Sequence, residues 1–256
     1  MPDSGTIIGR FSRLGAYEKA AVALSAVIAA FLVLDPIVLS AVRGLDPDLR
    51  RFFRLLTDVG ESGWILIPSG AGILLLAWLH ARERSLRRGV IFDYVSKLLV
   101  YLFVTVALSG LTVSLLKNVI GRARPKFHDE LGSLAFHPFS FDYSFAAFPS
   151  GHATTIGALA GVLAIIWPRA RVPVLLAGAW FAATRFLIAS HYFTDAVAGY
   201  ALGLAFAYFV RGSLARRGWL FKLDRQGNVR LRGRTFLRAA ARSLKARALS
   251  RTMDKH

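Results

Sequence analysis

Three separated stretches of the chain carry polar residues whose types and spacing could do chemistry. They read KNVIGRARP at 117–125, PSGH at 149–152 and TRFLIASHYFTD at 184–195. Each adjoins an apolar segment, and ionisable residues in such positions usually serve a function because they are costly near lipid. These stretches are the candidate functional site.

The first stretch supplies two cations, Lys117 and Arg124. They stand seven residues apart, or two helical turns, so on a continuing helix they would share one face. Two cations suit a dianionic phosphate, and an arginine binds two of its oxygens at once. Arg122 and Lys126 are expected to extend towards the membrane interface instead.

The second stretch predicts the start of a helix. Ser150 stands at the N-cap position after Pro149, so the free N–H groups of Gly151 and His152 would point out of the helix end. Such an end binds anions. Taken alone, the pattern is more typical of an ordinary capped helix start.

The third stretch pairs His191 with Asp195, four residues later. A helix that begins just before them would place both on one face. A carboxylate on one imidazole nitrogen fixes the tautomer and leaves the other lone pair free to attack. Arg185 adds a third cation. For the pair alone, a structural hydrogen bond is the alternative.

Together the stretches contain what phosphoryl transfer through a phosphohistidine requires. The pattern K-x6-RP, PSGH and (S/T)R-x5-H-x3-D resembles the type 2 phosphatidic acid phosphatase (PAP2) superfamily of membrane lipid phosphatases. The resemblance covers roughly residues 20–210. Thr184 stands where that family usually has serine, which keeps a hydroxyl group at this position.

The resemblance implies a role for each matching residue. His191 would attack phosphorus, His152 would act as general acid and then as general base, and Asp195 would orient His191. The expected phosphate-binding residues are Lys117, Arg124, Ser150, Gly151 and Arg185. The scheme needs no metal and no cofactor. A metal site built from His152, His191, Asp195, His128 and His137 ranks below it, because the three cations would repel a divalent ion.

The composition predicts how these residues are held. The chain has 256 residues, 55% of them hydrophobic, and a mean hydropathy of +0.47. Apolar runs of about 20 residues recur, each long enough to cross a bilayer. No cysteine is present, so there is no disulfide. We predict an all-α polytopic membrane protein with six transmembrane helices, at about 20–42, 63–81, 95–116, 150–167, 172–190 and 194–210.

Two local features refine this prediction. Asp35-Pro36 predicts a kink in the first span. Glycines at four-residue spacing predict close helix contacts, and they are Gly157, Gly161, Gly199 and Gly203.

Charge predicts the sidedness. With the N-terminus inside, the inner segments carry 23 Lys and Arg residues and the outer segments nine. Cytoplasmic loops are enriched in such residues. We therefore expect a cytoplasmic segment at 1–19, the transmembrane domain at 20–210 and a basic cytoplasmic tail at 211–256. All three polar stretches then face the periplasm of a bacterial inner membrane.

Three further segments have open interpretations. Residues 45–60, capped by Asp46 with Pro47 in the first turn, predict a short helix that either lies in the outer interface or packs as a loop helix. The tail, with helical spacing at 235–251, is either a membrane-surface helix or a solvated segment. The Phe-rich loop at 126–148 either forms a lip for lipid entry or covers helix ends.

The net charge of +18 is attributed to positive-inside bias and to contact between the basic tail and anionic lipid headgroups, with no nucleic acid partner. The expected function is a metal-independent lipid phosphate phosphatase. Its substrate would be phosphatidic acid, phosphatidylglycerol phosphate, undecaprenyl pyrophosphate or lipid A. A lipid phosphotransferase with the same site is the alternative, and an anion or lipid transporter ranks below both.

Overall fold

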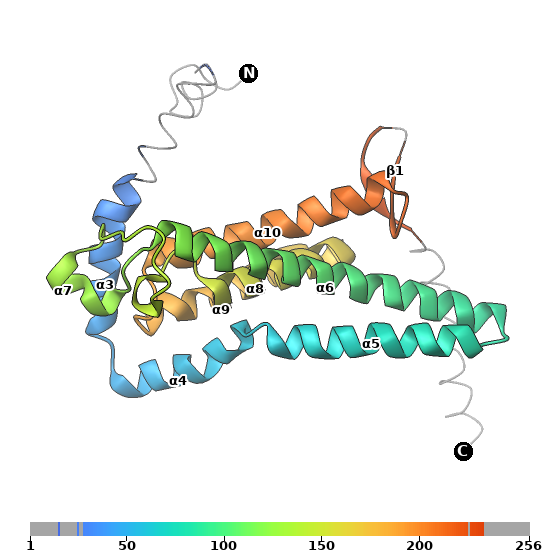
Figure 1. Cartoon of the computed structure of the whole chain (residues 1–256), viewed down its shortest axis with the longest axis horizontal. Coiled ribbons are helices and arrows are strands. Elements are labelled where there is room, and N and C mark those ends of the chain that lie inside the picture. The colour runs from blue at the N-terminus through green and yellow to red at the C-terminus, as the bar shows by residue number, and fades with distance from the viewer. Residues whose placement is uncertain (1–14, 16–24, 26–27, 225, 233–256) are drawn as a thin grey trace.

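The structure is a computed structural model that describes residues 15, 25, 28–224 and 226–232. The described residues form helices and one short β-hairpin. Five long helices run side by side, with short elements gathered at one end of the bundle and the hairpin at the other (Figure 1). The short elements α3 (Asp35–Arg43), α4 (Pro47–Thr57) and α7 (His128–Leu131) lie beside the loops that carry the three polar stretches.

The first predicted span lies partly outside the described residues, which exclude 20–24 and 26–27. Its described part is a π-helical turn, η1 (Ala30–Leu34), followed by α3 (Asp35–Arg43). The irregular turn directly precedes the predicted kink at Asp35-Pro36. Proline disrupts the hydrogen bonds of the turn before it, which is the physical reason for an irregularity here.

The predicted helix near 45–60 is present as α4 (Pro47–Thr57), followed by the short 3-10 helix η2 (Asp58–Gly60). The Asp46 side chain accepts from the backbone N–H of Asp48 at 2.8 Å, which confirms the cap. Phe53 is buried and packs edge-on against Trp180, with ring centroids 5.9 Å apart, whereas Leu55 is 71% exposed. The helix therefore packs on one face and presents apolar surface on the other.

The five long helices correspond to predicted spans two to six, but their first and last residues differ from the predicted ones. They are α5 (Gly63–Arg82), α6 (Leu86–Ile120), α8 (Gly151–Ile166), α9 (Arg171–Leu187) and α10 (Phe193–Arg216). A 3-10 turn, η5 (Pro168–Ala170), connects α8 to α9. Helix α8 packs against α6, α9 and α10, so it occupies the centre of the bundle.

Four helical segments of the described chain are long and apolar enough to cross a membrane. They are Pro47–Arg82, which combines α4, η2 and α5, then Leu86–Ile120, Pro168–Leu187 and Phe193–Arg216. Helix α8 has 16 residues, or about 24 Å at 1.5 Å per residue, less than the roughly 30 Å of a bilayer core. The prediction of a helical membrane protein is confirmed, but the count of six spans is not.

The predicted close contacts at glycines are confirmed between α8 and α10. A Cβ atom added at Gly157 would lie 2.2 Å from the carbonyl oxygen of Tyr200, and one added at Gly203 would lie 2.1 Å from that of Thr154. Backbone oxygens cannot yield as a flexible side chain does. Only glycine therefore permits this helix separation, which sets the distance between the starts of α8 and α10 and hence between the second and third polar stretches.

We predict that Gly203→Ala destabilises the protein by about 1–3 kcal/mol, because the added methyl group overpacks a tight helix contact. Gly212→Ala, on the same helix, is the matched control: its nearest neighbour would be a flexible arginine nitrogen at 3.8 Å. The free energy of unfolding in detergent measures both. Equal stabilities for the two variants would contradict the prediction.

The first residues after 210 do not form the tail that the sequence predicted. Helix α10 continues to Arg216, and an antiparallel hairpin follows, β1 (Phe221–Leu223) with β2 (Val229–Leu231). Phe221 is buried edge-on against Tyr101 of α6, with ring centroids 5.1 Å apart. This part of the tail is therefore packed on the bundle. The predicted helix at 235–251 lies outside the described residues.

The loop between α6 and α8 contains three short elements, η3 (Pro125–Phe127), α7 (His128–Leu131) and η4 (Tyr143–Phe145). A backbone hydrogen bond holds this loop over the helix ends: the N–H of Ala147 donates to the carbonyl of Arg122 at 3.1 Å. Phe139 and Phe141 are 72% and 86% exposed. Both interpretations of this loop therefore have support: it covers the helix ends and also presents phenylalanines outward.

Candidate active site

Lys117 and Arg124 do not lie on one continuing helix, so that expectation was wrong. Helix α6 ends at Ile120, and Gly121 follows with φ of +63°, its N–H donating to the carbonyl of Lys117. Glycine tolerates this left-handed conformation and commonly ends helices this way. Lys117 is therefore in the last turn of the helix, while Arg124 reaches the site from an extended segment.

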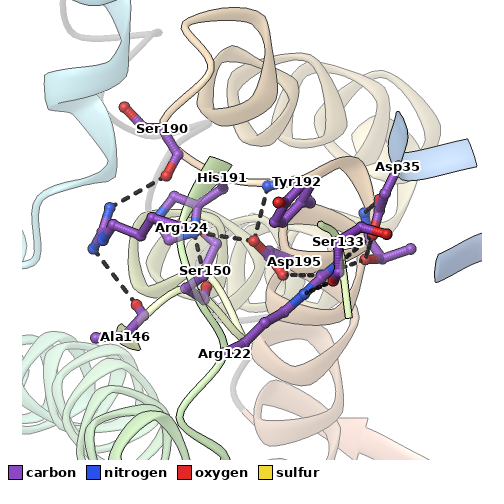
Figure 2. A network of polar contacts seen from close by, with 12 residues as sticks. Asp35, Arg122, Arg124, Ser133, Ala146, Ser150, Ser190, His191, Tyr192 and Asp195 are labelled. Carbon is purple, nitrogen blue, oxygen red and sulfur yellow. Dashed lines mark hydrogen bonds and ion pairs between the residues drawn. The ribbon is translucent and has the colours of Figure 1, made fainter. Parts of the chain in front are cut away.

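The Arg124 guanidinium is fixed by backbone carbonyls. It donates to Ser190 at 3.2 Å and to Ala146 at 3.5 Å (Figure 2). It also donates to the carbonyl of Tyr143 at 3.0 Å and stacks on the Tyr143 ring. Three of its five N–H groups are used in this way. Within the described residues, one hydrogen on each terminal nitrogen remains for an anion, which is the arrangement for bidentate binding of phosphate.

Ser150 occupies the N-cap position of α8, as predicted, but its side chain does not cap the helix. Its hydroxyl oxygen is buried and has no hydrogen-bond partner among the described residues. Its backbone N–H donates to the carbonyl of Asp195 at 3.0 Å, which joins the second and third polar stretches. A buried hydroxyl without a partner costs about 1–3 kcal/mol, so a ligand oxygen would stabilise it.

The N-terminal end of α8, which no side chain caps, lies next to Lys117. A Cβ atom added at Gly151 would lie 3.2 Å from the Lys117 Nζ atom, so the glycine leaves room for the ammonium group beside the first N–H groups of the helix. Helix N-termini and ammonium groups both attract anions. The two features therefore form one anion-binding corner.

His191 is held by a backbone carbonyl rather than by Asp195. Its Nδ1 atom lies 2.8 Å from the carbonyl oxygen of Ala147 but 3.6 Å from Asp195 Oδ2, too far for a hydrogen bond. A carbonyl only accepts, so Nδ1 carries the proton and Nε2 keeps its lone pair. The expected hydrogen bond between His191 and Asp195 was wrong, because α10 begins at Phe193 and leaves His191 outside it.

The imidazole of His191 is 2% exposed. Burial lowers the pKa of His191 to about 4, against the opposing effect of Asp195, and the neighbouring Arg185 and Arg124 lower it further. The ring is therefore neutral at physiological pH. A neutral ring with a free Nε2 is the form that can act as a nucleophile.

Asp195 is fully buried and takes part in a network that the sequence did not reveal. Its two oxygens accept from Arg122 Nη1 at 2.5 Å and from the backbone N–H of Tyr192 at 2.8 Å (Figure 2). Arg122 also donates to Asp35 at 2.7 Å, and Asp35 accepts from the Thr194 hydroxyl at 2.6 Å. The expectation that Arg122 extends to the interface was wrong, since it is 0% exposed.

This network could have been suspected from Asp35. A single carboxylate within an apolar run is costly unless it is paired, so its presence required a cationic partner. The identity of the partner, 87 residues later in the chain, depended on the fold.

Arg185 reaches the site from the last turn of α9. Its Nη1 atom donates to the Thr57 hydroxyl of α4 at 2.8 Å, and its Nε atom is buried without a partner among the described residues. Thr184 is also buried and donates to the carbonyl of Phe181 at 2.6 Å. Helix α4 therefore positions one cation of the site, a role that the sequence did not indicate.

We predict that Thr57→Val lowers kcat/KM about tenfold, because loss of one hydrogen bond to a charged group costs roughly 1.5 kcal/mol and valine keeps the shape of threonine. Ser40→Ala is the control, since its hydroxyl donates to the Ile37 carbonyl within α3 and, among the described residues, to nothing in the site. Phosphatase kinetics on both variants measure the effect. Unchanged kinetics for Thr57→Val would contradict the role of this contact.

A groove of about 500 Å³ leads from the anion-binding corner along the bundle between α5, α6 and α8. Lys117, Gly151 and His152 line one end. The rest of the lining mixes apolar residues such as Leu66 and Val106 with polar ones, among them Glu61 and Ser114. Gly60 permits close packing here, because an added Cβ would lie 2.7 Å from the His152 Cβ atom. The groove suits a molecule with a phosphate at one end and a lipid chain at the other.

The structure thus brings the predicted site residues to one end of the bundle. Lys117, Arg124 and Arg185 are within electrostatic range of one another, and His152 is within range of His191. Lys126 lies apart, bonding to Ser144, and His128 contacts the Tyr192 hydroxyl. No group of three His, Cys, Asp or Glu residues within the described part of the chain is placed to hold a metal ion.

Comparisons with known proteins identify the family. The sequence model of the PAP2 superfamily matches residues 98–219. A lipid A 1-phosphatase from Rhizobium johnstonii is 38% identical over 213 residues, which are 80% of this chain and 84% of that protein. The chain belongs to the PAP2 superfamily. It is a membrane phosphatase, as the predicted motifs implied.

Two further proteins are similar to this PAP2 phosphatase. A lipid A 1-phosphatase from Rhizobium etli is 36% identical over 213 residues, covering 80% of this chain and 88% of that protein. The first transmembrane PAP2 type phosphatidylglycerolphosphate phosphatase from Bacillus subtilis has a solved crystal structure. It is 22% identical, covers 76% of this chain and 89% of that chain, and gives a TM-score of 0.46.

Proposed function

We propose that this PAP2 phosphatase removes the 1-phosphate of lipid A through a phosphohistidine at His191, without a metal, on the periplasmic face of a bacterial inner membrane. The observation that carries the mechanism is the hydrogen bond of 2.8 Å between His191 Nδ1 and the Ala147 carbonyl. It leaves Nε2 free, with Arg124 and Arg185 close enough to act electrostatically on the ring. The names of two relatives at 36–38% identity support the substrate.

The first chemical step forms a P–N bond and breaks the P–O bond to the lipid. His191 Nε2 attacks phosphorus, while Lys117, Arg124 and Arg185 stabilise the charge that develops on the phosphoryl oxygens. The Ser150 hydroxyl and the Gly151 N–H add two donors. His152, which lines the groove, protonates the departing lipid oxygen.

The second step hydrolyses the intermediate. His152 takes a proton from a water molecule, whose oxygen attacks phosphorus and releases His191 and inorganic phosphate. Asp195 lies 3.6 Å from His191 Nδ1, so its charge stabilises the phosphorylated imidazole without forming a hydrogen bond. Arg122 holds this carboxylate in place.

The charge distribution supports the periplasmic placement. The site lies at the C-terminal ends of α6 and α9 and the N-terminal ends of α8 and α10. The connection between α5 and α6, with the arginine-rich helix ends on either side of it, and the basic hairpin lie at the opposite end of the bundle (Figure 1). Basic residues are enriched on the cytoplasmic side of membrane proteins.

The test is an assay of the purified full chain in detergent against lipid A, phosphatidic acid, phosphatidylglycerol phosphate and undecaprenyl pyrophosphate. We expect the highest kcat/KM on lipid A, with mass spectrometry showing loss of the 1-phosphate and release of inorganic phosphate without any acceptor lipid. A higher value on another substrate would reject the lipid A assignment. Phosphate transfer only in the presence of an acceptor lipid would indicate a phosphotransferase.

We expect full activity in excess EDTA, because cations of the chain itself neutralise the transferring phosphoryl group. Phosphate release with and without EDTA, on enzyme purified in chelator, measures this. An unrelated Mg²⁺-dependent phosphatase in the same buffer shows that chelation is complete. Loss of activity that one divalent ion restores would contradict the metal-free mechanism.

A further inference from the structure

The end of the bundle opposite the active site contains a second hollow, of about 720 Å³, between α8, α9, α10 and the hairpin. We refer to it as the basic pocket. Its polar lining residues are Arg171, Tyr208, Arg211, Lys222, Arg230 and Arg232. Arg211 follows Asp195 by 16 residues on α10, or about 24 Å at 1.5 Å per residue, so the two sites are separate.

The basic pocket carries a large excess of positive charge. Five of its lining residues are cationic and none is acidic. Arg230 is paired with Asp224 at 2.8 Å, but the other four cations have no acidic partner among the described residues. Like charges around one cavity repel one another, and an anion between them relieves that repulsion.

Tyr208 holds two of these cations in place. Arg171 donates to its hydroxyl at 2.6 Å, and the Arg211 guanidinium lies over its ring, 5.0 Å from the centroid. The Nε atom of Arg211 is buried without a hydrogen-bond partner among the described residues. Buried N–H groups nearly always have a partner, so this one indicates a ligand oxygen.

The remaining lining residues are apolar and include Ile165, Phe221 and Leu231. A pocket that is basic on one side and apolar on the other suits a phosphate group attached to a lipid. Arg171 is the first residue of α9, and Arg211 lies near the C-terminal end of α10. The pocket is therefore at the depth where membrane helices end and headgroups lie.

The chain's own C-terminal segment does not fit as an occupant. Residues 233–256 carry seven Lys and Arg residues and a single acidic side chain, Asp254. A basic segment would be repelled by a basic pocket. Charge complementarity thus favours an anionic ligand from outside the chain.

We propose that the basic pocket binds the phosphate-bearing headgroup of an anionic phospholipid in the leaflet opposite the active site. The headgroup clamps the hairpin onto α9 and α10, because Arg171 and Arg211 lie on the helices while Lys222 and Arg232 lie on or next to the hairpin. The site is independent of the catalytic reaction and of its substrate.

The experiment measures the melting temperature of the full chain in neutral detergent with phosphatidylglycerol, with zwitterionic phosphatidylcholine, or with inorganic phosphate alone. The pocket variant is Arg171→Gln with Arg211→Gln. The matched control is Arg216→Gln with Arg217→Gln, which removes the same charge from exposed positions outside the pocket lining. Hydrolysis of a water-soluble phosphate ester shows that each variant is folded, since none of these residues belongs to the catalytic site.

We expect phosphatidylglycerol to raise the melting temperature more than phosphatidylcholine in the wild type and the control, but not in the pocket variant. Because a ligand that binds only the folded state stabilises it, saturation at about 100 times Kd would give a shift of several degrees. If the pocket variant does not fold, Lys222→Gln with Arg232→Gln provides the same test from the hairpin side.

Two results would overturn the proposal. An equal loss of the phosphatidylglycerol effect in the pocket and control variants would show nonspecific attraction between lipid and net charge. A pocket-dependent shift of the same size with inorganic phosphate alone would assign the site to a free anion instead of a lipid. The outcome for lipid A hydrolysis does not affect either result, so the two proposals fail separately.

Discussion

Replacement of His191 by alanine is expected to abolish turnover, lowering kcat/KM by at least about 10⁴-fold, the scale seen when a catalytic nucleophile is removed. Without Nε2, no P–N bond can form, and the three cations are left to bind a phosphate that nothing attacks. The Ala147 carbonyl loses its partner, but backbone packing of the loop is retained.

The decisive measurement is trapping of radioactive phosphate on the protein. Wild-type enzyme quenched during turnover should carry acid-labile phosphate on the peptide that contains His191, and the alanine variant should carry none. His80→Ala is the control, because His80 bonds to the Gly89 carbonyl at the far end of the bundle. Near wild-type turnover in the His191 variant would eliminate the proposed nucleophile.

Replacement of Arg122 by methionine is expected to lower the free energy of unfolding by about 3–5 kcal/mol, the usual cost of removing one partner from a buried ion pair. Methionine fills much of the space of arginine but leaves Asp35 and Asp195 without their shared cation in a fully buried environment. Activity should fall as well, because Asp195 loses the contact that holds its carboxylate near His191.

Two comparison variants make this prediction specific. Arg43→Gln breaks the exposed pair with Asp129, where the side chains are 37% and 73% exposed, and should destabilise the protein far less because solvent screens the pair. Asp35→Asn leaves the bond between Arg122 and Asp195 in place, so it should retain more activity than Arg122→Met. Denaturant unfolding measures the stability of each variant, and phosphatase kinetics measure its activity. Equal losses for Arg122→Met and Arg43→Gln would show that the buried network contributes little.

Local sequence patterns predicted the individual pieces of the site well. Asp46 and Pro47 predicted the start of α4, and Ser150 marked the start of α8, because helix starts depend on residues within one turn. Predictions that assumed a helix would continue were less successful. Gly121 ended α6 four residues after Lys117, so the shared helical face with Arg124 never formed.

Contacts between distant residues could not be predicted in this way. Arg122 pairs with Asp35 across 87 residues, and Thr57 accepts from Arg185 across 128. Nothing in the spacing of these residues distinguishes a buried arginine from one that extends to the membrane surface. Their partners depend on how α3 and α4 pack at the end of the bundle.

By itself, the sequence determined that this is a helical membrane protein of the PAP2 type, and it predicted which residues carry its chemistry, because composition and short motifs depend on local physics. Only the tertiary structure decided that a carbonyl at Ala147 holds His191 and that Arg122 holds Asp195. Such assignments depend on distances of tenths of an ångström between segments far apart in the chain, which are set by helix packing at residues such as Gly157 and Gly203.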